Sequence, residues 1–302
     1  MKNLSIIIVN YNTKDLLIQC LESLDQALSL VTCHVSPEII VVDNGSTDGS
    51  VEEVEKRYKQ SLRPYGLEDI KILRSRQNLG FAKGNNVGIK QARGRFILLL
   101  NSDTVVEKNT ILEMLKFMEK NPKVGAATCK VVFPDGTLDP ACHRGFPTPW
   151  ASLTYFLGLE KLFPKSRLFG QYHLGFLPMD KPHEIDSPTG AFYLMKREVI
   201  DKVGLLDGDY FMYGEDLDWS YRIKQAGWKI MYYPDIKIVH FKKQSGRARE
   251  DARVRKETTS HFYETMKIFY QKHYLEKYPR IVTASIMLAI EIKKRLSLIT
   301  IH

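Results

Sequence analysis

The first 120 residues alternate short apolar runs with longer segments of helical periodicity, and this alternation restricts the chain to one class of fold. We expect strands at residues 4–9, 38–42, 70–73 and 95–100, and helices at 15–28, 47–60, 81–92 and 108–119. Strand–helix alternation at this spacing predicts βαβ units, and therefore a doubly wound, mostly parallel α/β sheet flanked by helices. The run 95–100 is almost wholly apolar, which is typical of a strand at the centre of such a sheet.

Polar residues follow three of these strands at the point where each strand ends. They are Asn10-Tyr11-Asn12, Asp43-Asn44 and Asn101-Ser102-Asp103. Because ligands of open α/β sheets bind beyond the carboxyl ends of the strands, we expect these side chains to share one crevice. Asp43 and Asp103 directly follow apolar strands, and for them we favour a functional role. Asn44, Ser46 and Asp48 fit ordinary turn chemistry equally well.

The second half of the chain has a looser pattern. Residues 134–188 contain eight of the 13 prolines and predict an elaborated loop with a short helix at 150–162. Further strands are expected at 190–195 and 229–233, a helix between them at 216–226, and a long helix at 255–272. We therefore expect a catalytic domain at 1–254, with a nucleotide-binding half (1–123) and an acceptor half (124–254), followed by a C-terminal helical extension (255–302).

An acidic cluster stands in the second half, where Glu215, Asp216 and Asp218 fall within four residues, after the aromatic run 210–213. Neighbouring carboxylates repel one another unless a cation or a helix N-terminus stabilises them. An acidic helix start is the structural explanation, but the flanking aromatic residues favour a functional site. His240 is a lone histidine in a strand-like run, and by itself it indicates only a structural residue.

The chain carries 44 Lys and Arg against 35 Asp and Glu, a formal net charge of +9, which predicts an anionic partner. Seven of these basic residues lie in the segment 242–256. The four cysteines form no Cys-x-x-Cys pair, so we expect reduced thiols and a cytoplasmic protein. We expect no signal peptide and no spanning helix, because no run reaches the roughly 18–20 apolar residues that a membrane span needs.

Seven segments in order resemble the family 2 glycosyltransferases, which have the GT-A fold, over roughly residues 3–245. The segments are Ser5–Asn12, Ile40–Ser50, Asn78–Asn86, Leu99–Asp103, Thr189–Ala191, Gly214–Asp218 and Ala226–Trp228. The reading Leu-Asn-x-Asp at 100–103 resembles rhamnosyltransferase-like enzymes of surface polysaccharide assembly. This resemblance implies an inverting, single-displacement transfer of a sugar, with rhamnose as the first expectation, from a nucleotide diphosphate donor to a glycan or lipid-linked acceptor.

The resemblance also implies roles for particular residues. Asp43 would accept a hydrogen bond from the base, and Asp216 would be the general base for the acceptor hydroxyl, with Asp218 as the competing candidate. Glu215 would help to bind the acceptor. The other residues expected to border the nucleotide-sugar are Val9, Asn10, Tyr11, Lys83, Asn85 or Asn86, Ser102, Asp103, Gly190 and Ala191, the last two together with Thr189.

The same resemblance implies a divalent cation, Mg²⁺ or Mn²⁺. Asp103 would bind it together with the donor diphosphate, and His240 matches a position that supplies a further metal contact in some relatives. Asn101 stands where the family usually has the first Asp of an Asp-x-Asp pair. An amide oxygen is a neutral ligand, so we expect weaker metal affinity and leave a strict metal requirement open.

The tail, 278–302, lies beyond the resemblance. Ile281, Met287, Leu288, Ile292 and Leu296 can share an apolar face, with basic residues close behind. An interfacial helix at the inner face of the membrane is one interpretation. A helix packed on the catalytic domain, or in a homodimer interface, is the other, and we favour it slightly.

Two rival functions remain at this point. A nucleotidyltransferase also combines a doubly wound sheet with a metal-bound nucleotide, but Asn10-Tyr11-Asn12-Thr13 stands where a Gly-rich phosphate loop is expected. A nucleic-acid-binding protein would explain the positive charge and predicts aromatic side chains interleaved with basic ones. Here the aromatic residues gather near the acidic cluster, which would repel a phosphate backbone, so we expect no nucleic-acid partner.

Overall fold

A computed structural model describes residues 3–30, 36–58, 70–242 and 252–301 of the chain. Its sheet is built from nine strands in the described residues: β1 (Leu4–Asn10), β2 (Pro37–Asp43), β3 (Ile70–Arg74), β4 (Phe96–Asn101), β5 (Thr104–Val106), β6 (Val124–Val132), β7 (His183–Ile185), β8 (Phe192–Lys196) and β9 (Lys229–His240). The helices are α1 (Lys14–Leu28), α2 (Ser50–Tyr58), α3 (Gly80–Gln91), α4 (Thr110–Lys120), α5 (Pro149–Phe156), α6 (Leu159–Leu162), α7 (Arg197–Val203), α8 (Glu215–Gln225), α9 (Ala252–His273) and α10 (Arg280–Ile299). The helices that pack on the strands are mainly α1, α3, α4, α7 and α8.

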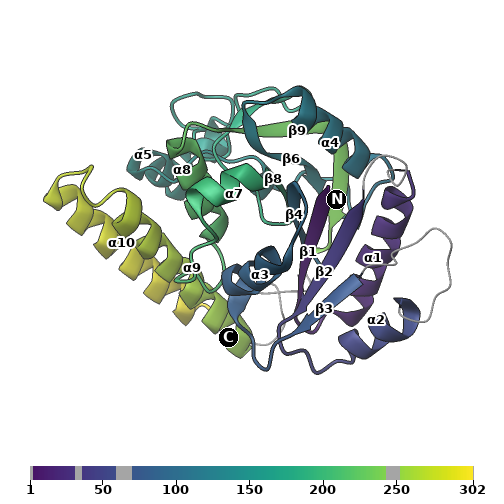
Figure 1. Cartoon of the computed structure of the whole chain (residues 1–302). Helices are drawn as coiled ribbons and strands as arrows, with labels where there is room; N and C mark the ends of the chain where they lie inside the picture. The colour runs from purple at the N-terminus through teal and green to yellow at the C-terminus, as the bar shows by residue number, and fades with distance from the viewer. Residues whose placement is uncertain (1–2, 31–35, 59–69, 243–251, 302) are drawn as a thin grey trace.

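The strand order is β3-β2-β1-β4-β8-β6-β9-β5, and β7 also pairs with β9. The first four strands of this order are parallel, β8 runs against its neighbours β4 and β6, and β9 is parallel to β6. With β5 and β7 antiparallel to β9, six of the nine strands in the described ranges share one direction. The expected mostly parallel α/β sheet flanked by helices is confirmed (Figure 1).

The strands of the first half form as expected because their residues are apolar on both faces. Leu4, Ile6, Ile7 and Ile8 of β1 are fully buried between helices on the two sides of the sheet, and β2 and β4 are buried in the same way. Strands covered on both faces require such continuous apolar runs. The two C-terminal helices lie side by side at one end of the molecule, away from α1 and α2 (Figure 1).

The second half differs from the sequence expectation in several elements. The nine-residue strand β6 and the short strand β7 were not expected, nor was the short strand β5 in the first half. Strand β9 joins the expected strand at 229–233 with the strand-like run that ends at His240. The sequence of β6, VGAATCKVV, is rich in small residues with weak strand preference, so its pairing with β8 and β9 decides its conformation. The expected helix at 150–162 is two helices, because Gly158 adopts a positive φ of 74° between them.

The C-terminal helices pack against each other and against α8. The Tyr263 hydroxyl of α9 lies 2.7 Å from the Ser297 hydroxyl of α10, and Lys294 forms an ion pair with Glu264. Phe269 and Tyr270 of α9 join a buried cluster with aromatic residues of α8 and the segment before it. Within the described ranges, no helix combines the length and the apolarity that crossing a bilayer requires.

The basic segment 242–256 is only partly described, since residues 243–251 lie outside the described residues. Lys242 Nζ lies 3.1 Å from Asp139 Oδ1, and α9 begins at Ala252. The sequence also predicts that this basic segment is a flexible loop that closes over a bound donor. That prediction concerns residues that lie mostly outside the described ranges.

Alanine substitutions of one buried and one exposed isoleucine test which side chains the fold buries. Ile7 in β1 is 0% exposed, whereas Ile281 in α10 is 77% exposed. We expect Ile7→Ala to lower the free energy of unfolding by about 2–5 kcal/mol, because it leaves a cavity in the sheet. Ile281→Ala should change it by less than about 0.5 kcal/mol. Urea unfolding followed by circular dichroism measures both, and equal losses would contradict this arrangement of the core.

Candidate functional site

The carboxyl ends of β1 and β2 bring Asn10 and Asp43 together. The two residues are partners in the parallel register, and Asn10 Nδ2 donates to Asp43 Oδ1 at 3.2 Å. The backbone N–H of Ser46 donates to the other carboxylate oxygen at 3.1 Å. Asp43 is buried, while Tyr11, which follows Asn10, is exposed beside it. The structure therefore brings the polar residues at these two strand ends into contact, and their place in a ligand crevice stays a prediction.

Asn44, Ser46 and Asp48, which the sequence also allowed as ordinary turn residues, make structural hydrogen bonds in and around the turn after β2. Asp48 accepts hydrogen bonds from the backbone N–H groups of Lys14 at the start of α1 and of Ser50 at the start of α2. Asn44 donates to the carbonyl of Gly80, and the Ser46 hydroxyl accepts from Asn10 Nδ2. Each side chain thus holds the loops around the crevice in place.

The residues of α3 show mixed accessibility. Asn85 is buried and donates to the carbonyl of Phe81 one turn earlier, while Asn86 exchanges hydrogen bonds with the backbone of Leu206. Lys83 is exposed on the same helix. Their expected contacts with a nucleotide remain predictions, and the amides of Asn85 and Asn86 have a structural function in addition.

Strand β4 and strand β9 bring Asn101, Asp103 and His240 together. His240 Nε2 lies 3.2 Å from Asp103 Oδ1 and 3.3 Å from Asn101 Nδ2. Ser102, between Asn101 at the end of β4 and Asp103 just after it, shares a hydrogen bond with the Thr13 hydroxyl. In the part of the chain that the structure describes, Asn101 Oδ1 and Asp103 Oδ2 are buried without a hydrogen-bond partner.

Asp139 fixes His240 from the other side. This fully buried carboxylate lies 3.3 Å from His240 Nδ1 and also binds Lys242. Burial alone lowers the pKa of His240, but the hydrogen bonds to Asp103 and Asp139 raise it to about 9. Burial raises the pKa of Asp139, yet the hydrogen bond from His240 and the charge of Lys242 lower it to about 2.

This arrangement fits a divalent cation. Two buried oxygens without partners are donor types that Mn²⁺ and Mg²⁺ accept. The imidazole of His240, held by Asp139, would become a further ligand after it loses the proton on Nε2. No group of three or more His, Cys, Asp or Glu residues among the described side chains forms a metal cluster. A bound cation would therefore need further ligands, such as the oxygens of a substrate.

A cavity of about 420 Å³ connects this cluster with the acidic start of α8. Asn101 and His240 line it, as do Thr189, Gly190 and Ala191 before β8, and Glu215 and Asp216 at the N-terminus of α8. Gly190 permits this approach because a Cβ there would come within 2.8 Å of the Phe81 ring. Gly214 adopts a φ of 79°, which turns the chain into α8 and aims the first acidic residues at the cavity.

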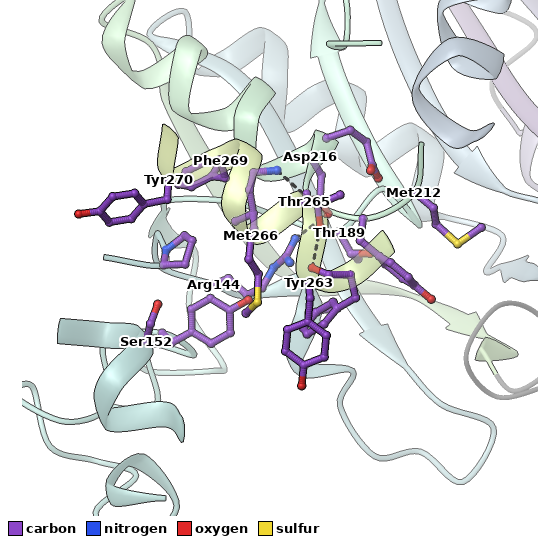
Figure 2. A pocket seen from close by; sticks show the side chains of 18 of the residues that line it. Arg144, Ser152, Thr189, Met212, Asp216, Tyr263, Thr265, Met266, Phe269 and Tyr270 are labelled. Carbon is purple, nitrogen blue, oxygen red and sulfur yellow. Dashed lines mark hydrogen bonds and ion pairs between the residues drawn. The ribbon is translucent and has the colours of Figure 1, made fainter. Parts of the chain in front are cut away.

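Arg144 holds Asp216 in the cavity, as Figure 2 shows. Its guanidinium donates to Asp216 Oδ2 at 2.6 Å and to the carbonyl of Pro188 at 2.6 Å. Both side chains of the ion pair are nearly buried. The remaining oxygen, Asp216 Oδ1, accepts only the backbone N–H of Leu217 in the described structure.

Asp218, the competing candidate for the base, lies in a different environment. Arg222 lies 2.7 Å from one of its oxygens and His273 Nε2 lies 2.7 Å from the other. Burial raises the pKa of Asp218, but the hydrogen bond from His273 and the charge of Arg222 bring it below its ordinary value. Asp218 does not line the cavity, and its contacts link α8 to α9 instead.

Glu215 is buried, and its Oε2 has no hydrogen-bond partner in the described ranges. Burial, followed by the negative charge of Asp216, raises its pKa to about 8. Two adjacent carboxyl groups in the cavity thus differ, because only Asp216 has an arginine partner. A neutral Glu215 next to a charged Asp216 is an arrangement that separates a proton donor from a proton acceptor.

Sequence reasoning missed Arg144 and Asp139. Both lie in or beside the proline-rich region 134–188, where no periodicity indicates which side chains point inward. The one signal for Asp139 is the Asp-Pro pair, since its side chain accepts from the N–H of Ala141 in the turn that follows. No local pattern indicates the pairing of Arg144 with a residue 72 positions later.

The sequence profile described as "Glycosyl transferase family 2" matches residues 5–204. The chain is 26% identical over 237 residues to N-acetylglucosaminyl-diphospho-decaprenol L-rhamnosyltransferase of Mycobacterium tuberculosis, covering 74% of this chain and 73% of the relative. It is also 26% identical over 243 residues to the low-salt glycan biosynthesis hexosyltransferase Agl10 of Haloferax volcanii, covering 79% and 67%.

Two solved structures support the fold. The mannosyltransferase PcManGT of Pyrobaculum calidifontis, in complex with GDP-Man and Mn²⁺, is similar with a TM-score of 0.60 and 17% identity over 98% of this chain and 72% of that one. The S. aureus TarS 1–349 structure has a TM-score of 0.56 and 19% identity, with the same coverage. At these identities the likeness concerns the fold alone.

The raised pKa of Glu215 makes a stability prediction. Below its ordinary pKa of 4.5 the carboxyl group is neutral in both folded and unfolded chains, so it adds no pH dependence there. Between pH 4.5 and about 8 the unfolded chain ionises first, and stability falls as the pH rises. Glu215→Gln removes this loss, so its melting temperature relative to the parent should rise by at least about 2 °C between pH 5 and pH 9.

The matched control for this experiment is Glu276→Gln. Glu276 is exposed, so its side chain stays in water when the chain folds. Its difference from the parent in melting temperature should be the same at both pH values. A pH-independent difference for Glu215→Gln as well would contradict the environment described for Glu215.

Proposed function

We propose a specific reaction for this chain, which belongs to glycosyl transferase family 2 and is a nucleotide-sugar-dependent glycosyltransferase of glycan synthesis. The reaction is the inverting transfer of a sugar, with rhamnose as the first candidate, from a nucleotide diphosphate to a hydroxyl of a lipid-linked glycan acceptor. The observation that carries the proposal is Asp216, a carboxylate fixed by Arg144 in a cavity that also reaches Asn101 and His240.

Asp216 acts as the general base. An alcohol is a weak nucleophile, so a carboxylate within hydrogen-bond reach must take its proton as the attack on the sugar proceeds. The hydrogen bond from Arg144 orients the side chain of this cavity-lining residue and leaves Asp216 Oδ1 with only the N–H of Leu217 as a partner among the described residues. Glu215, neutral at pH 7 by its raised pKa, can donate a hydrogen bond to the acceptor without repelling Asp216.

The leaving nucleotide diphosphate gains negative charge during the transfer and requires positive groups near it. Asp103 and His240, with Asn101, would hold a divalent cation there, and such a cation would neutralise the diphosphate. Lys242 lines the same cavity and adds a fixed positive charge. Asp139 is a positioning residue, because it touches His240 and Lys242 and does not line the cavity.

The donor and the acceptor are proposed from two observations. Asp43 and Asn10 close the strand-end crevice as a hydrogen-bonded pair beside exposed Tyr11, which suits a nucleobase. The relative from Mycobacterium tuberculosis is named for rhamnose and for a diphospho-decaprenol acceptor, which supports thymidine diphosphate rhamnose and a lipid-linked acceptor. A lipid-linked acceptor would place the reaction at the cytoplasmic face of the membrane.

Two conservative substitutions in α8 test the base assignment. Asp216→Asn keeps an oxygen for Arg144 but cannot take a proton, so we expect kcat for transfer to fall by about 10²–10⁴-fold, with binding of the nucleotide unchanged. Asp218→Asn weakens contacts with Arg222 and His273 outside the cavity, so it should lower the melting temperature while transfer continues. Assays with radiolabelled donor measure both, and the reverse pattern would assign the base to Asp218.

A thermal-shift panel of nucleotide diphosphate sugars tests donor and metal together. Thymidine diphosphate rhamnose with Mn²⁺ should raise the melting temperature by about 5 °C at a hundredfold excess over Kd. Asp103→Ala should remove the part of the shift that depends on Mn²⁺, because one of the buried oxygens is lost. An identical shift in EDTA would exclude the cation from donor binding, and a larger shift with a uridine diphosphate sugar would replace the proposed donor.

A further inference from the structure

The cavity extends beyond the acidic residues into an apolar compartment. Its walls come from three helices: Leu153 and Phe156 of α5, Met266 and Phe269 of α9, and Ala289 and Ile290 of α10. Figure 2 shows Met266, Phe269 and Tyr270 on one side of Arg144 and Asp216, with Ser152 of α5 nearby. A water-soluble glycan has little apolar surface to bury against such walls, so their chemistry favours an acceptor that carries a hydrocarbon group.

This compartment opens between α5 and α10. Leu153 lines the cavity and is 48% exposed, and Lys293 of α10 lines it as an exposed residue. Lys293 Nζ lies 5.4 Å from the centre of the Phe156 ring, so the two helices face each other across the opening. We call this opening, between Leu153, Phe156, Ile290 and Lys293, the acceptor mouth.

A positive charge stands at the acceptor mouth without a carboxylate partner. Nearby basic residues of α10 are neutralised, since Lys294 pairs with Glu264 and Arg295 with Glu291. Among the described residues, Lys293 makes no ion pair and contacts only the face of Phe156. An ammonium group at an apolar opening is complementary to a ligand that joins a phosphate to a hydrocarbon chain.

The outer surface beside the acceptor mouth is apolar as well. Trp150 of α5 and Leu157 after it are exposed, and Leu288, Ile292 and Leu296 form an exposed apolar stripe on a different face of α10 from the one that lines the cavity. In Figure 1, α5 lies beside α10, as the contact of Lys293 with Phe156 requires. A hydrocarbon chain that leaves the mouth would therefore first meet exposed apolar side chains of α5, beginning with Leu153.

We infer that the acceptor mouth binds the phosphate and the first part of the hydrocarbon chain of a lipid-phosphate-linked acceptor. The acceptor sugar lies inside, with its hydroxyl at Asp216, and Lys293 holds the phosphate. This inference deepens the proposed function and rests on it for the identity of the cavity as the acceptor side. It assigns roles to Lys293 and α10, which lie outside the segment that the family profile matches.

Farnesyl diphosphate is a suitable probe, and its binding to the full chain can be measured by titration calorimetry below its micelle concentration, in EDTA. We expect the Kd of farnesyl diphosphate to be at least tenfold lower than those of inorganic diphosphate and of farnesol. Inorganic diphosphate lacks the hydrocarbon chain, and farnesol lacks the phosphate groups. Lys293→Gln should weaken farnesyl diphosphate binding by about tenfold and leave farnesol binding unchanged. Ala289→Trp should abolish binding by filling the apolar compartment.

The matched control is Arg295→Gln, which removes one positive charge from the same helix two residues later, on a different face. It should leave farnesyl diphosphate binding unchanged. Equal losses for Lys293→Gln and Arg295→Gln would show general attraction to a basic helix and overturn the inference, as would equal affinity for farnesyl diphosphate and inorganic diphosphate. If Ala289→Trp does not fold, Lys293→Gln still tests the inference, because Lys293 is exposed.

Failure of this inference and failure of the proposed function give different results. Farnesyl diphosphate binding needs no donor and no proton transfer. If Asp216→Asn leaves transfer intact, the base assignment is wrong, but the binding of farnesyl diphosphate by the parent protein still supports the acceptor mouth. Conversely, the parent protein could transfer sugar but bind farnesyl diphosphate no better than inorganic diphosphate. That result would support the proposed function and contradict the acceptor mouth.

Discussion

The need of buried carboxylates for partners is the constraint on which the rest of this structure depends. An isolated charge in the interior costs several kcal/mol, so each carboxylate must have a partner that reaches it. Asp43 has Asn10, Asp139 has His240 and Lys242, Asp216 has Arg144, and Asp218 has Arg222 and His273. These partners come from strands, a loop and the C-terminal helix α9, so pairing joins segments that are far apart in the sequence.

The partners also give different environments to residues that look equivalent in the sequence. Glu215, Asp216 and Asp218 belong to one helix start, yet each has a different environment. Asp218 is held by two cationic or polar side chains on the side of α9, Asp216 has one arginine and faces the cavity, and Glu215 has none. The consequence is a neutral Glu215 beside a charged Asp216, and this difference underlies the roles we propose for them.

The C-terminal helices complete the walls of the cavity. Walls of the cavity come from both sides of the expected domain boundary at 254–255, since α5 and α8 precede it and α9 and α10 follow it. The contact of His273 with Asp218 and the aromatic cluster around Phe269 tie α9 to the helix that bears the proposed base. Because α10 packs on α9, the position of Lys293 depends on this same contact.

The sequence by itself determined the first half of the sheet and the places where it carries polar residues. Runs such as 4–9 and 95–100 are apolar on both faces, and a strand with that pattern has to be buried in a parallel sheet, with its polar end at the ligand edge. The ordered motifs then indicated the family. Strands β5, β6 and β7 were missed because short or small-residue strands are stabilised by their neighbours rather than by their own preferences. Only the tertiary structure decided that Arg144 meets Asp216, that Asp139 supports His240, and that Asp218 is turned away from the cavity. These are contacts between segments tens of residues apart, and the free energy that selects them is the cost of leaving a buried charge without a partner.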